Sequence, residues 1–324
     1  MKIAIVTDKQ RSGLLTGEEG RHEDRQKRET VLNIKEVLSK RFECIDLIAD
    51  DNIIARLREE RVDMVFNLCN GIKGDCKLAQ LPAMLEFAGI PYTGSSVMGH
   101  ALSLNKGYAC RVFQSMGIPT PNFISVYSVD ELKTKNIQFP VLVKPSDEGS
   151  GRGIHQDSLV CDMDSLIKKV DRELNTYNPP VMVTDFIDGR EFTVGVIGNG
   201  DEVEVLPIME IGFDNLPQDM ARFYSFEVKT YYGEKTTYTC PADIDNVLKE
   251  RIEQTAILAY RTLSIRDYAR IDMRVKDGVP YVLEINSLPG LWKGYSDLPK
   301  MAESSGLGYE GLIMKIVESA LKRL

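Results

Sequence analysis

Residues 269–286 read ARIDMRVKDGVPYVLEIN, with two alternating apolar and polar segments on either side of the turn-forming KDG. Alternation of this kind predicts two antiparallel β-strands that bury one face and expose the other. The expected apolar face of this hairpin consists of Ile271, Met273, Val275, Tyr281, Leu283 and Ile285.

Burying both apolar sets together fixes the register of the hairpin, because a slip of one residue would turn one strand over. In the register that we expect, Ile271 lies opposite Ile285 and Met273 lies opposite Leu283. The strand ends at a Ser-Leu-Pro-Gly sequence, so the last residues of the hairpin are expected to lie where a ligand can approach.

The polar face of the predicted hairpin brings two carboxylates and a carboxamide together beside an arginine. Asp272 is expected opposite Glu284, and Arg270 opposite Asn286. The Cβ atoms of directly opposed residues are about 5 Å apart, so the two carboxylates repel each other unless a cation joins them. Oxygen ligands of this kind suit Mg²⁺, which keeps waters and binds substrate phosphates. We therefore predict a magnesium site at Asp272, Glu284 and Asn286, with an ordinary solvated face as the alternative.

Size and charge restrict the classes of function. The chain has 324 residues, 43% of them hydrophobic, so it can form two or three domains with cores of their own. A formal net charge of -8 argues against nucleic-acid binding through a broad basic surface. No stretch has the length of a membrane span, and the first apolar run is too short for a signal peptide. Six scattered cysteines without zinc spacing are typical of a reducing cytosol, so we expect a cytoplasmic protein without nucleic-acid or membrane partners.

Strand and helix patterns alternate over the first hundred residues, which predicts an α/β domain at residues 1–103. The polar, glycine-containing segment at 8–27 is expected to be a surface loop or a lid over the site. The elements that we predict along the chain are strands at 3–6, 62–66, 140–144, 181–187, 192–197 and 203–209, and helices at 30–38, 81–87, 245–263 and 309–321.

A glycine-rich loop, PSDEGSGRG at 145–153, follows the strand that ends at Lys144. Glycines leave backbone N–H groups open to phosphate oxygens, and a lysine adds a positive charge. The loop matches neither the P-loop nor the dinucleotide-binding fingerprint, and alone it is typical of an ordinary turn. Combined with the magnesium site, Gly149, Ser150 and Gly151 predict that a nucleoside triphosphate binds here.

From about Val62 to the C-terminus, the chain resembles the ATP-grasp superfamily and, within it, the D-alanine–D-alanine ligase family. Several motifs occur in the family's order: IPYTGS at 90–95, LNK at 104–106, GIPTP at 117–121, KP at 144–145, EGS at 148–150, DGREFTV at 188–194, YARID at 268–272, LEIN at 283–286 and LPG at 288–290. The resemblance implies an ATP-grasp fold, α/β overall and α+β in the nucleotide-binding half. It also implies a central subdomain at 104–187 and a C-terminal subdomain at 188–324 that carries the metal and catalytic site.

The resemblance further implies a role for each residue that matches a family motif. ATP phosphates would be contacted by Lys106, Lys144 and Lys229 together with Gly149, Ser150 and Gly151. The adenine-side hinge would consist of Asp185, Phe186 and Ile187, and Glu191 would hold the ribose hydroxyls.

Two Mg²⁺ ions, for which Mn²⁺ could substitute, would be bound by Asp272, Glu284 and Asn286. The residues that would act at the reacting centre are Arg270, Ser150 and, through its N–H, Gly290. Glu29 would hold the ammonium of the first substrate.

The reaction implied by the resemblance joins a carboxylate to an amine. ATP phosphorylates the carboxylate to an acyl phosphate, which the amine then attacks to form an amide. The implied partners are amino acids or peptides as substrates, with a homodimer possible.

Departures from the family pattern cluster in the half of the chain expected to bind substrates. Asn70 stands where the family has a histidine, Arg152 follows the loop's Gly151, and Thr230 occupies the place of a tyrosine. Ser296-Asp297 replaces a serine–leucine pair that receives the carboxylate of the second amino acid. An acid there would repel a carboxylate, so we expect a ligase of altered acceptor specificity.

Three alternatives remain open from the sequence. The chain could be a D-alanine–D-alanine ligase proper of cell-wall synthesis, which would form that dipeptide. It could be an ATP-grasp small-molecule kinase, which would release a stable phosphorylated product. It could also be a non-catalytic nucleotide-binding module, although the combination of metal ligands and Arg270 argues against binding alone.

Overall fold

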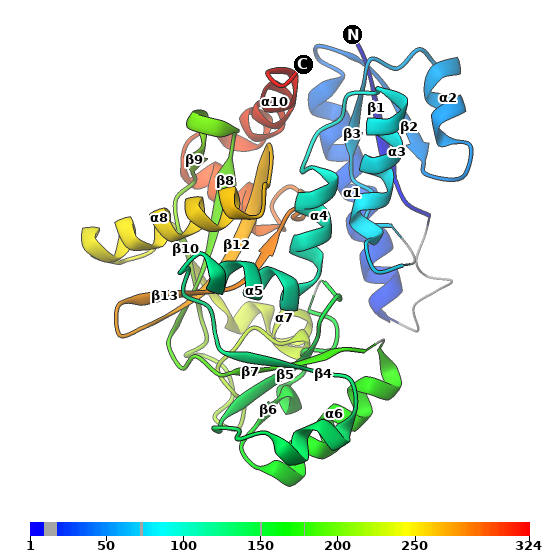
Figure 1. Cartoon of the computed structure of the whole chain (residues 1–324). Helices are drawn as coiled ribbons and strands as arrows, with labels where there is room; N and C mark the ends of the chain where they lie inside the picture. Colours follow the sequence, from blue (N-terminus) through cyan, green and yellow to red (C-terminus); the bar gives the residue numbers. More distant parts are fainter. Residues whose placement is uncertain (10–17, 72–73, 150, 178) are drawn as a thin grey trace.

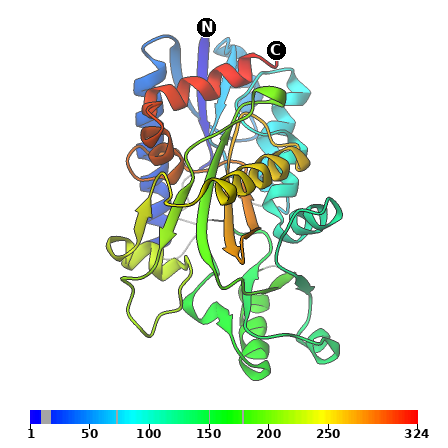
Figure 2. The same ribbon diagram turned by 90° about the vertical axis from the view of Figure 1, so that its left-hand side faces the viewer.

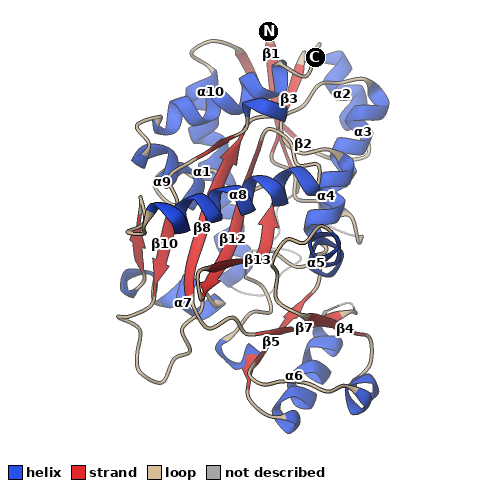
Figure 3. Cartoon of the chain, turned by 60° about the vertical axis from the view of Figure 1, so that its left-hand side comes forward, coloured by secondary structure: helices blue, strands red, loops and turns tan. Residues whose placement is uncertain are grey.

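The computed structural model describes residues 1–9, 18–71, 74–149, 151–177 and 179–324. Three regions are visible in it: an N-terminal domain at one end, a small sheet near the middle of the sequence at the other end, and a large C-terminal sheet between them (Figures 1 and 3). Both termini lie at the same end of the molecule (Figure 2). No helix in the described ranges is both long and apolar enough to cross a membrane.

The N-terminal domain is built on a parallel sheet in the order β2-β1-β3. Its central strand is apolar on both faces, with Ile3, Ala4, Ile5 and Val6 almost fully buried, as is usual for parallel strands covered by helices. The elements are β1 (Lys2–Thr7), α1 (Glu18–Leu38), β2 (Glu43–Ile48), α2 (Ile53–Glu59), β3 (Met64–Asn67), α3 (Gln80–Ala88) and α4 (Val97–Leu104).

Helix α1 begins earlier than its apolar spacing indicated. The prediction of a loop over residues 8–27 is wrong from Glu18 onward, because that part is helical. Four polar residues further along the helix, Glu23, Gln26, Lys27 and Thr30, line a cavity of the site rather than the core. Residues 10–17 lie outside the described part of the chain.

The small sheet in the middle of the sequence is antiparallel, in the order β4-β7-β5-β6. Helix α6 shares a core with its strands through Leu166 and Val170. The elements are β4 (Phe123–Val126), β5 (Val141–Pro145), β6 (Leu159–Val160), α6 (Met163–Thr176) and β7 (Val181–Asp185). The helix before this sheet, α5 (Lys106–Ser115), packs into the C-terminal core through Ala109 and Phe113. The subdomain boundary at residue 104 remains a prediction.

The C-terminal region contains an antiparallel sheet in the order β11-β10-β8-β12-β13, with β9 paired to β8. Helix α8 lies across one face of this sheet (Figure 3). The predicted strand at 203–209 is wrong as a single strand, since it is divided between β9 and β10. The elements are β8 (Arg190–Ile197), β9 (Glu204–Val205), β10 (Met209–Gly212), α7 (Phe226–Tyr231), β11 (Thr237–Thr239), α8 (Asn246–Thr262), β12 (Tyr268–Lys276), β13 (Val279–Asn286), α9 (Asp297–Ser304) and α10 (Gly308–Leu321).

The β12–β13 hairpin has the predicted register at its functional end. Arg270 pairs with Asn286, Ile271 with Ile285 and Asp272 with Glu284. The register shifts beyond the Asp272–Glu284 pair.

A β-bulge follows Asp272, so Met273 pairs with Val282 and the predicted pairing with Leu283 is wrong. The extra residue reverses the faces beyond it: Val282 is buried and Leu283 lines the cavity beside Glu284. Bulges commonly re-aim side chains next to active sites in this way.

A buried ion pair joins the N-terminal and C-terminal regions. Asp267 is fully buried and accepts two hydrogen bonds from Arg323, at 2.9 and 2.7 Å. It also accepts from the Gly94 backbone N–H at 2.7 Å and from Asn199 Nδ2 at 2.8 Å. One carboxylate thus links the loop before α4, the turn after β8, and the end of α10.

We expect Asp267→Asn to destabilise the protein strongly, because the change leaves the Arg323 charge without its partner. Asparagine tolerates the positive φ of 63° at this position, so the backbone is retained. Breaking one side of a buried ion pair costs about 3–5 kcal/mol, measurable by urea unfolding. Lys322→Met, which removes an exposed ion pair with Glu202, is the control and should leave the midpoint unchanged. Equal midpoints for all three proteins would contradict this account.

Candidate active site

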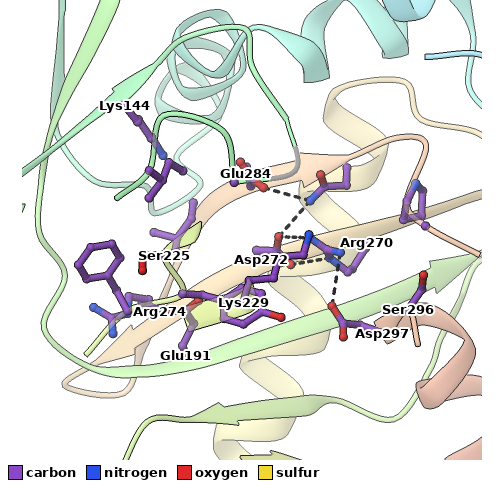
Figure 4. A pocket seen from close by; sticks show the side chains of 18 of the residues that line it. Lys144, Glu191, Ser225, Lys229, Arg270, Asp272, Arg274, Glu284, Ser296 and Asp297 are labelled. Atoms are coloured by element: carbon purple, nitrogen blue, oxygen red, sulfur yellow. Dashed lines mark hydrogen bonds and ion pairs between the residues drawn. The ribbon is translucent and has the colours of Figure 1, made fainter. Parts of the chain in front are cut away.

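A cavity of about 400 Å³ lies where the three regions meet, and Figure 4 shows the side chains around it. Strands β5, β8, β12 and β13, helix α7 and the start of α9 all contribute to its walls. The predicted site residues that line it are Lys144, Gly151, Asp185, Phe186, Ile187, Glu191, Lys229, Arg270, Asp272, Glu284, Asn286 and Gly290.

Two more predicted residues line an adjoining cavity of about 120 Å³. Lys106 and Gly149 lie there, and Glu284 and Asn286 line both cavities. Ser150 lies outside the described residues.

Glu29 is absent from the lining of these cavities and of a third one beside α1. Residues of α1 that do line them are Glu23, Gln26, Lys27 and Thr30, which occupy another side of the helix.

The centre of the site is the carboxylate pair on the hairpin. Arg270 donates two hydrogen bonds to the Asp272 carboxylate, from Nε at 2.9 Å and from Nη2 at 2.7 Å. Thr193 Oγ1 donates to the same carboxylate at 2.7 Å. Asn286 Nδ2 lies between the two acids, 3.0 Å from Asp272 and 3.3 Å from Glu284.

Lysines from other elements complete the charge balance at the hairpin. Lys106 Nζ lies 3.7 Å from Glu284 Oε2, and Lys144 is buried nearby. Burial acts to raise the pKa of Glu284, but Lys106, Lys144 and Arg270 outweigh it and lower that pKa. Glu284 is therefore an anion at neutral pH, in a site with several cations around it. Such a site suits a bound group that carries several negative charges.

Arg274 lines the part of the cavity near Ile187 and Glu191. It is buried on the same strand face as Arg270 and Asp272. Its Nη1 donates to the Ile187 carbonyl at 2.8 Å, and its Nε lies 3.1 Å from Glu191. Its guanidinium also lies over the Phe186 ring, 4.7 Å from the centroid. Burial raises the pKa of Glu191 to about 7, although Arg274 acts in the opposite direction.

The glycine-rich loop is attached to the N-terminal domain through Glu148. Lys77 Nζ donates to Glu148 Oε1 at 3.1 Å, and Arg152 Nη2 lies 2.7 Å from Oε2. Lys106 donates to the Glu148 backbone carbonyl. Two basic residues far apart in sequence, Lys77 and Arg152, thus meet at one carboxylate.

Gly290 lies at a point where a side chain has no room. A Cβ there would lie 2.7 Å from Ser296 Oγ and 2.9 Å from Gln26 Nε2. Ser296 in turn accepts a hydrogen bond from the Trp292 N–H at 3.1 Å. The backbone of Gly290 is thereby exposed to the cavity, between α1 and the segment that leads to α9.

Several residues of the site were not predicted. Arg274 was detectable, because strand alternation places it on the same face as Asp272. The contributions of Thr193, Gln26 and the Glu148 side chain were not, since each depends on contacts between segments distant in sequence.

Comparisons with known proteins identify relatives of this chain. A family model described as "D-ala D-ala ligase C-terminus" matches residues 112–318. The uncharacterized protein y4sG of Sinorhizobium fredii is 38% identical over 261 residues, which cover 80% of this chain and 75% of that protein. A D-alanine–D-alanine ligase of Fervidobacterium nodosum is 32% identical over 296 residues, which cover 86% of this chain and 89% of that protein.

Among solved structures, the chain is similar to a D-alanine–D-alanine ligase from Bacillus anthracis complexed with ATP. The TM-score is 0.75 at 24% identity, covering 100% of this chain and 98% of that one, so the two share a fold. The chain therefore belongs to the D-alanine–D-alanine ligase family, which has the ATP-grasp fold, and it is an ATP-dependent ligase that forms carbon–nitrogen bonds.

Proposed function

We propose that this ligase joins the carboxylate of one amino acid or peptide to the amine of another through an acyl phosphate, with an acceptor specificity different from that of D-alanine–D-alanine ligases. One observation carries the proposal: Arg270, Asp272, Glu284 and Asn286 meet within a cavity that also holds Lys144 and Lys229. This arrangement combines a place for phosphates with a guanidinium that can stabilise a developing negative charge.

The nucleotide in this proposal occupies the side of the cavity lined by β5, β7 and β8. Residues 185–187 offer backbone groups to the adenine, and Glu191 accepts from the ribose hydroxyls. Lys144 and Lys229 are both buried, and burial lowers the pKa of each. Phosphate oxygens beside them favour the charged form of both lysines and so offset the effect of burial, which favours an anionic ligand.

Two divalent cations, Mg²⁺ or Mn²⁺, fit the donor set on the hairpin. Two directly opposed carboxylates and a carboxamide supply oxygen atoms, and Asn286 already lies within hydrogen-bonding distance of both acids. No cluster of three His, Cys, Asp or Glu side chains suited to a metal occurs among the described residues. The ions would therefore be held by Asp272, Glu284 and Asn286 together with phosphates and water, as is usual for Mg²⁺. When bound, they neutralise charge on the transferring phosphoryl group.

The chemistry proceeds in two balanced steps. A donor carboxylate oxygen attacks the γ-phosphorus, the bond to the β-phosphate oxygen breaks, and ADP leaves. The acceptor nitrogen then attacks the acyl carbon, the bond to the phosphate oxygen breaks, and the nitrogen gives up its extra proton to solvent as phosphate leaves. In this proposal, Arg270 and the Gly290 N–H hold the negative oxygen of the tetrahedral intermediate.

Synthesis of D-alanyl-D-alanine itself is the second candidate. It is favoured by relatives such as the Fervidobacterium nodosum protein, which carries that name. Against it stand Asp297 in the acceptor segment and Asn70 in the loop after β3, neither of which matches the pattern of those enzymes.

The setting that we propose is the cytoplasm, with small-molecule substrates and a homodimer as the assembly. The six cysteines, all within the described ranges, form no disulfide with one another, and unpaired cysteines of this kind are usual in a reducing compartment. Size-exclusion chromatography with light scattering would test the assembly.

The proposed function predicts magnesium-dependent phosphate release from ATP in the presence of a donor and an acceptor amino acid. D- and L-amino acids should be tested singly and in pairs, with mass spectrometry of the products. A new amide from a pair other than D-alanine with itself supports the proposal. D-alanyl-D-alanine as the main product would favour the second candidate, and a stable phosphorylated compound without an amide would favour a kinase.

Removal of one predicted metal ligand should raise the requirement for the ion. Glu284→Gln keeps the shape of the side chain but removes a negative charge, so the Mg²⁺ concentration for half-maximal phosphate release should rise. Losing such a ligand lowers turnover by about 10- to 100-fold or more. Glu250→Gln, on an exposed part of α8, is the matched control and should behave as wild type. An unchanged Mg²⁺ dependence in Glu284→Gln would exclude this residue as a ligand.

Affinity for the nucleotide should depend on the protonation of Glu191. Because its pKa is raised to about 7, Glu191 is largely protonated below pH 7 in the empty site. Accepting hydrogen bonds from the ribose hydroxyls requires the carboxylate form of this side chain. The dissociation constant of a non-hydrolysable ATP analogue should fall between pH 6 and pH 8. The ratio of its value at pH 6 to its value at pH 8 should be roughly tenfold larger in wild type than in Glu191→Gln. Titration of the analogue's phosphates is common to both proteins and cancels. Parallel pH profiles would contradict the role of Glu191.

A further inference from the structure

The acceptor end of the large cavity contains a carboxylate that the reaction described above does not use. Asp297, in the first turn of α9, lines the cavity and is only 12% exposed. Figure 4 shows it beside Arg270, on the side away from Glu284. It is the residue that replaces the family's leucine.

The contacts of Asp297 are longer than those of the neighbouring Asp272. Its Oδ2 lies 3.5 Å from Arg270 Nη1, and its Oδ1 lies 3.8 Å from Lys300 Nζ. Charge-assisted hydrogen bonds normally measure about 2.7–2.9 Å, the range that Asp272 reaches with Arg270. Among the described side chains, these two partners therefore attract Asp297 without saturating its oxygens. A ligand that donates hydrogen bonds has room to bind there.

Three tyrosines surround Asp297 and complete the walls of this part of the cavity. Burial, followed by the charge of Asp297, raises the pKa of Tyr224 and of Tyr295, and both effects also act on Tyr238. All three therefore stay neutral. Tyr224 and Tyr238 are joined by a hydrogen bond of 2.9 Å between their hydroxyls. A carboxylate flanked by neutral aromatic rings favours a cation.

Two of the cations near Asp297 are already engaged with acids, and the third, Lys229, is the one expected to receive an ATP phosphate. Arg270 holds Asp272 and faces Asp297, while Lys300 lies near Asp297 and over the Tyr238 ring, 4.3 Å from its centroid. An acceptor carboxylate placed here would meet the charge of Asp297 and would have to compete with it for both cations. An ammonium group is attracted by Asp297, and the repulsion from Arg270 and Lys300 is offset by the acids that these two cations already face.

We infer that Asp297 binds the ammonium group of the acceptor, and that the acceptor is an amine whose own carboxyl group is blocked, as at the N-terminus of a peptide. An ammonium on Asp297 lies next to the Arg270 guanidinium, and hence next to an acyl group that Arg270 polarises. It first loses one proton to solvent, and the neutral amine then attacks the acyl carbon as the bond to the phosphate oxygen breaks. This inference rests on the proposed ligase function and adds the chemical class of its second substrate.

The experiment separates the two half-reactions of the enzyme. Hydroxylamine, a small neutral nucleophile used at high concentration, traps the acyl phosphate as a hydroxamate without needing the acceptor site. Alaninamide and alanine, in D and L forms, then serve as blocked and unblocked acceptors with the donor that supports hydroxamate formation. Wild type, Asp297→Asn and Asp297→Leu are compared, with Asp214→Asn, an exposed acid outside the cavity lining, as the control.

We expect wild type to use alaninamide with a kcat/KM at least about tenfold above that for alanine. Asp297→Asn should lower kcat/KM for alaninamide by about tenfold or more, while hydroxamate formation changes by less than about twofold. Asp297→Leu should shift the preference toward alanine. The control should match wild type in every assay.

Two results would overturn the inference alone. One is an unchanged ratio of alaninamide to alanine use in both Asp297 variants. The other is a loss of hydroxamate formation in proportion to the loss of amide formation, which would place Asp297 in the donor half-reaction or in the stability of the site. If wild type forms no hydroxamate with any donor, the proposed function fails and this inference fails with it.

Discussion

Two carboxylates that face each other on neighbouring strands are the constraint on which the site depends. Asp272 and Glu284 are paired across the β12–β13 hairpin, and two adjacent anions in a half-buried place are unfavourable unless positive charge surrounds them. Arg270, from the same hairpin, satisfies one of them. Lys106, Lys144 and Lys229 come from α5, β5 and α7, so the hairpin is balanced only when separate parts of the chain meet around it.

The need for positive charge around Asp272 and Glu284 links the fold to the proposed chemistry. The same cations that lower the energy of the carboxylates are the groups expected to receive ATP phosphates, so one set of contacts organises the empty site and the loaded one. Glu148 extends the arrangement to the N-terminal domain through Lys77, and Asp267 holds that domain to the C-terminal region from the other side. These charge pairs add to the apolar core that the N-terminal domain shares with the C-terminal region, in which Ile5 and Phe66 pack in one cluster with Leu312.

The sequence predicted much of this arrangement because alternation and turn chemistry are local. The positions of Arg270, Asp272, Glu284 and Asn286 on one face follow from counting along two strands. The bulge after Asp272 could not be predicted in this way, since it depends on how the hairpin packs against α8 and β8. Its consequence is functional: Leu283 turns toward the cavity, while Val282 replaces it in the core.

What the sequence alone determined is the family, the α/β architecture and the hairpin that carries Arg270, Asp272, Glu284 and Asn286, because these depend on local patterns and on motifs in a fixed order. Only the tertiary structure decided which residues of α1 reach the cavity, that Lys77 and Arg152 share Glu148, and that Asp297 faces Arg270 with long contacts on both sides. The reason is physical. The partners of a side chain are set by the packing of whole helices and strands against one another. A pattern along the sequence does not identify which distant segment lies opposite a given side chain.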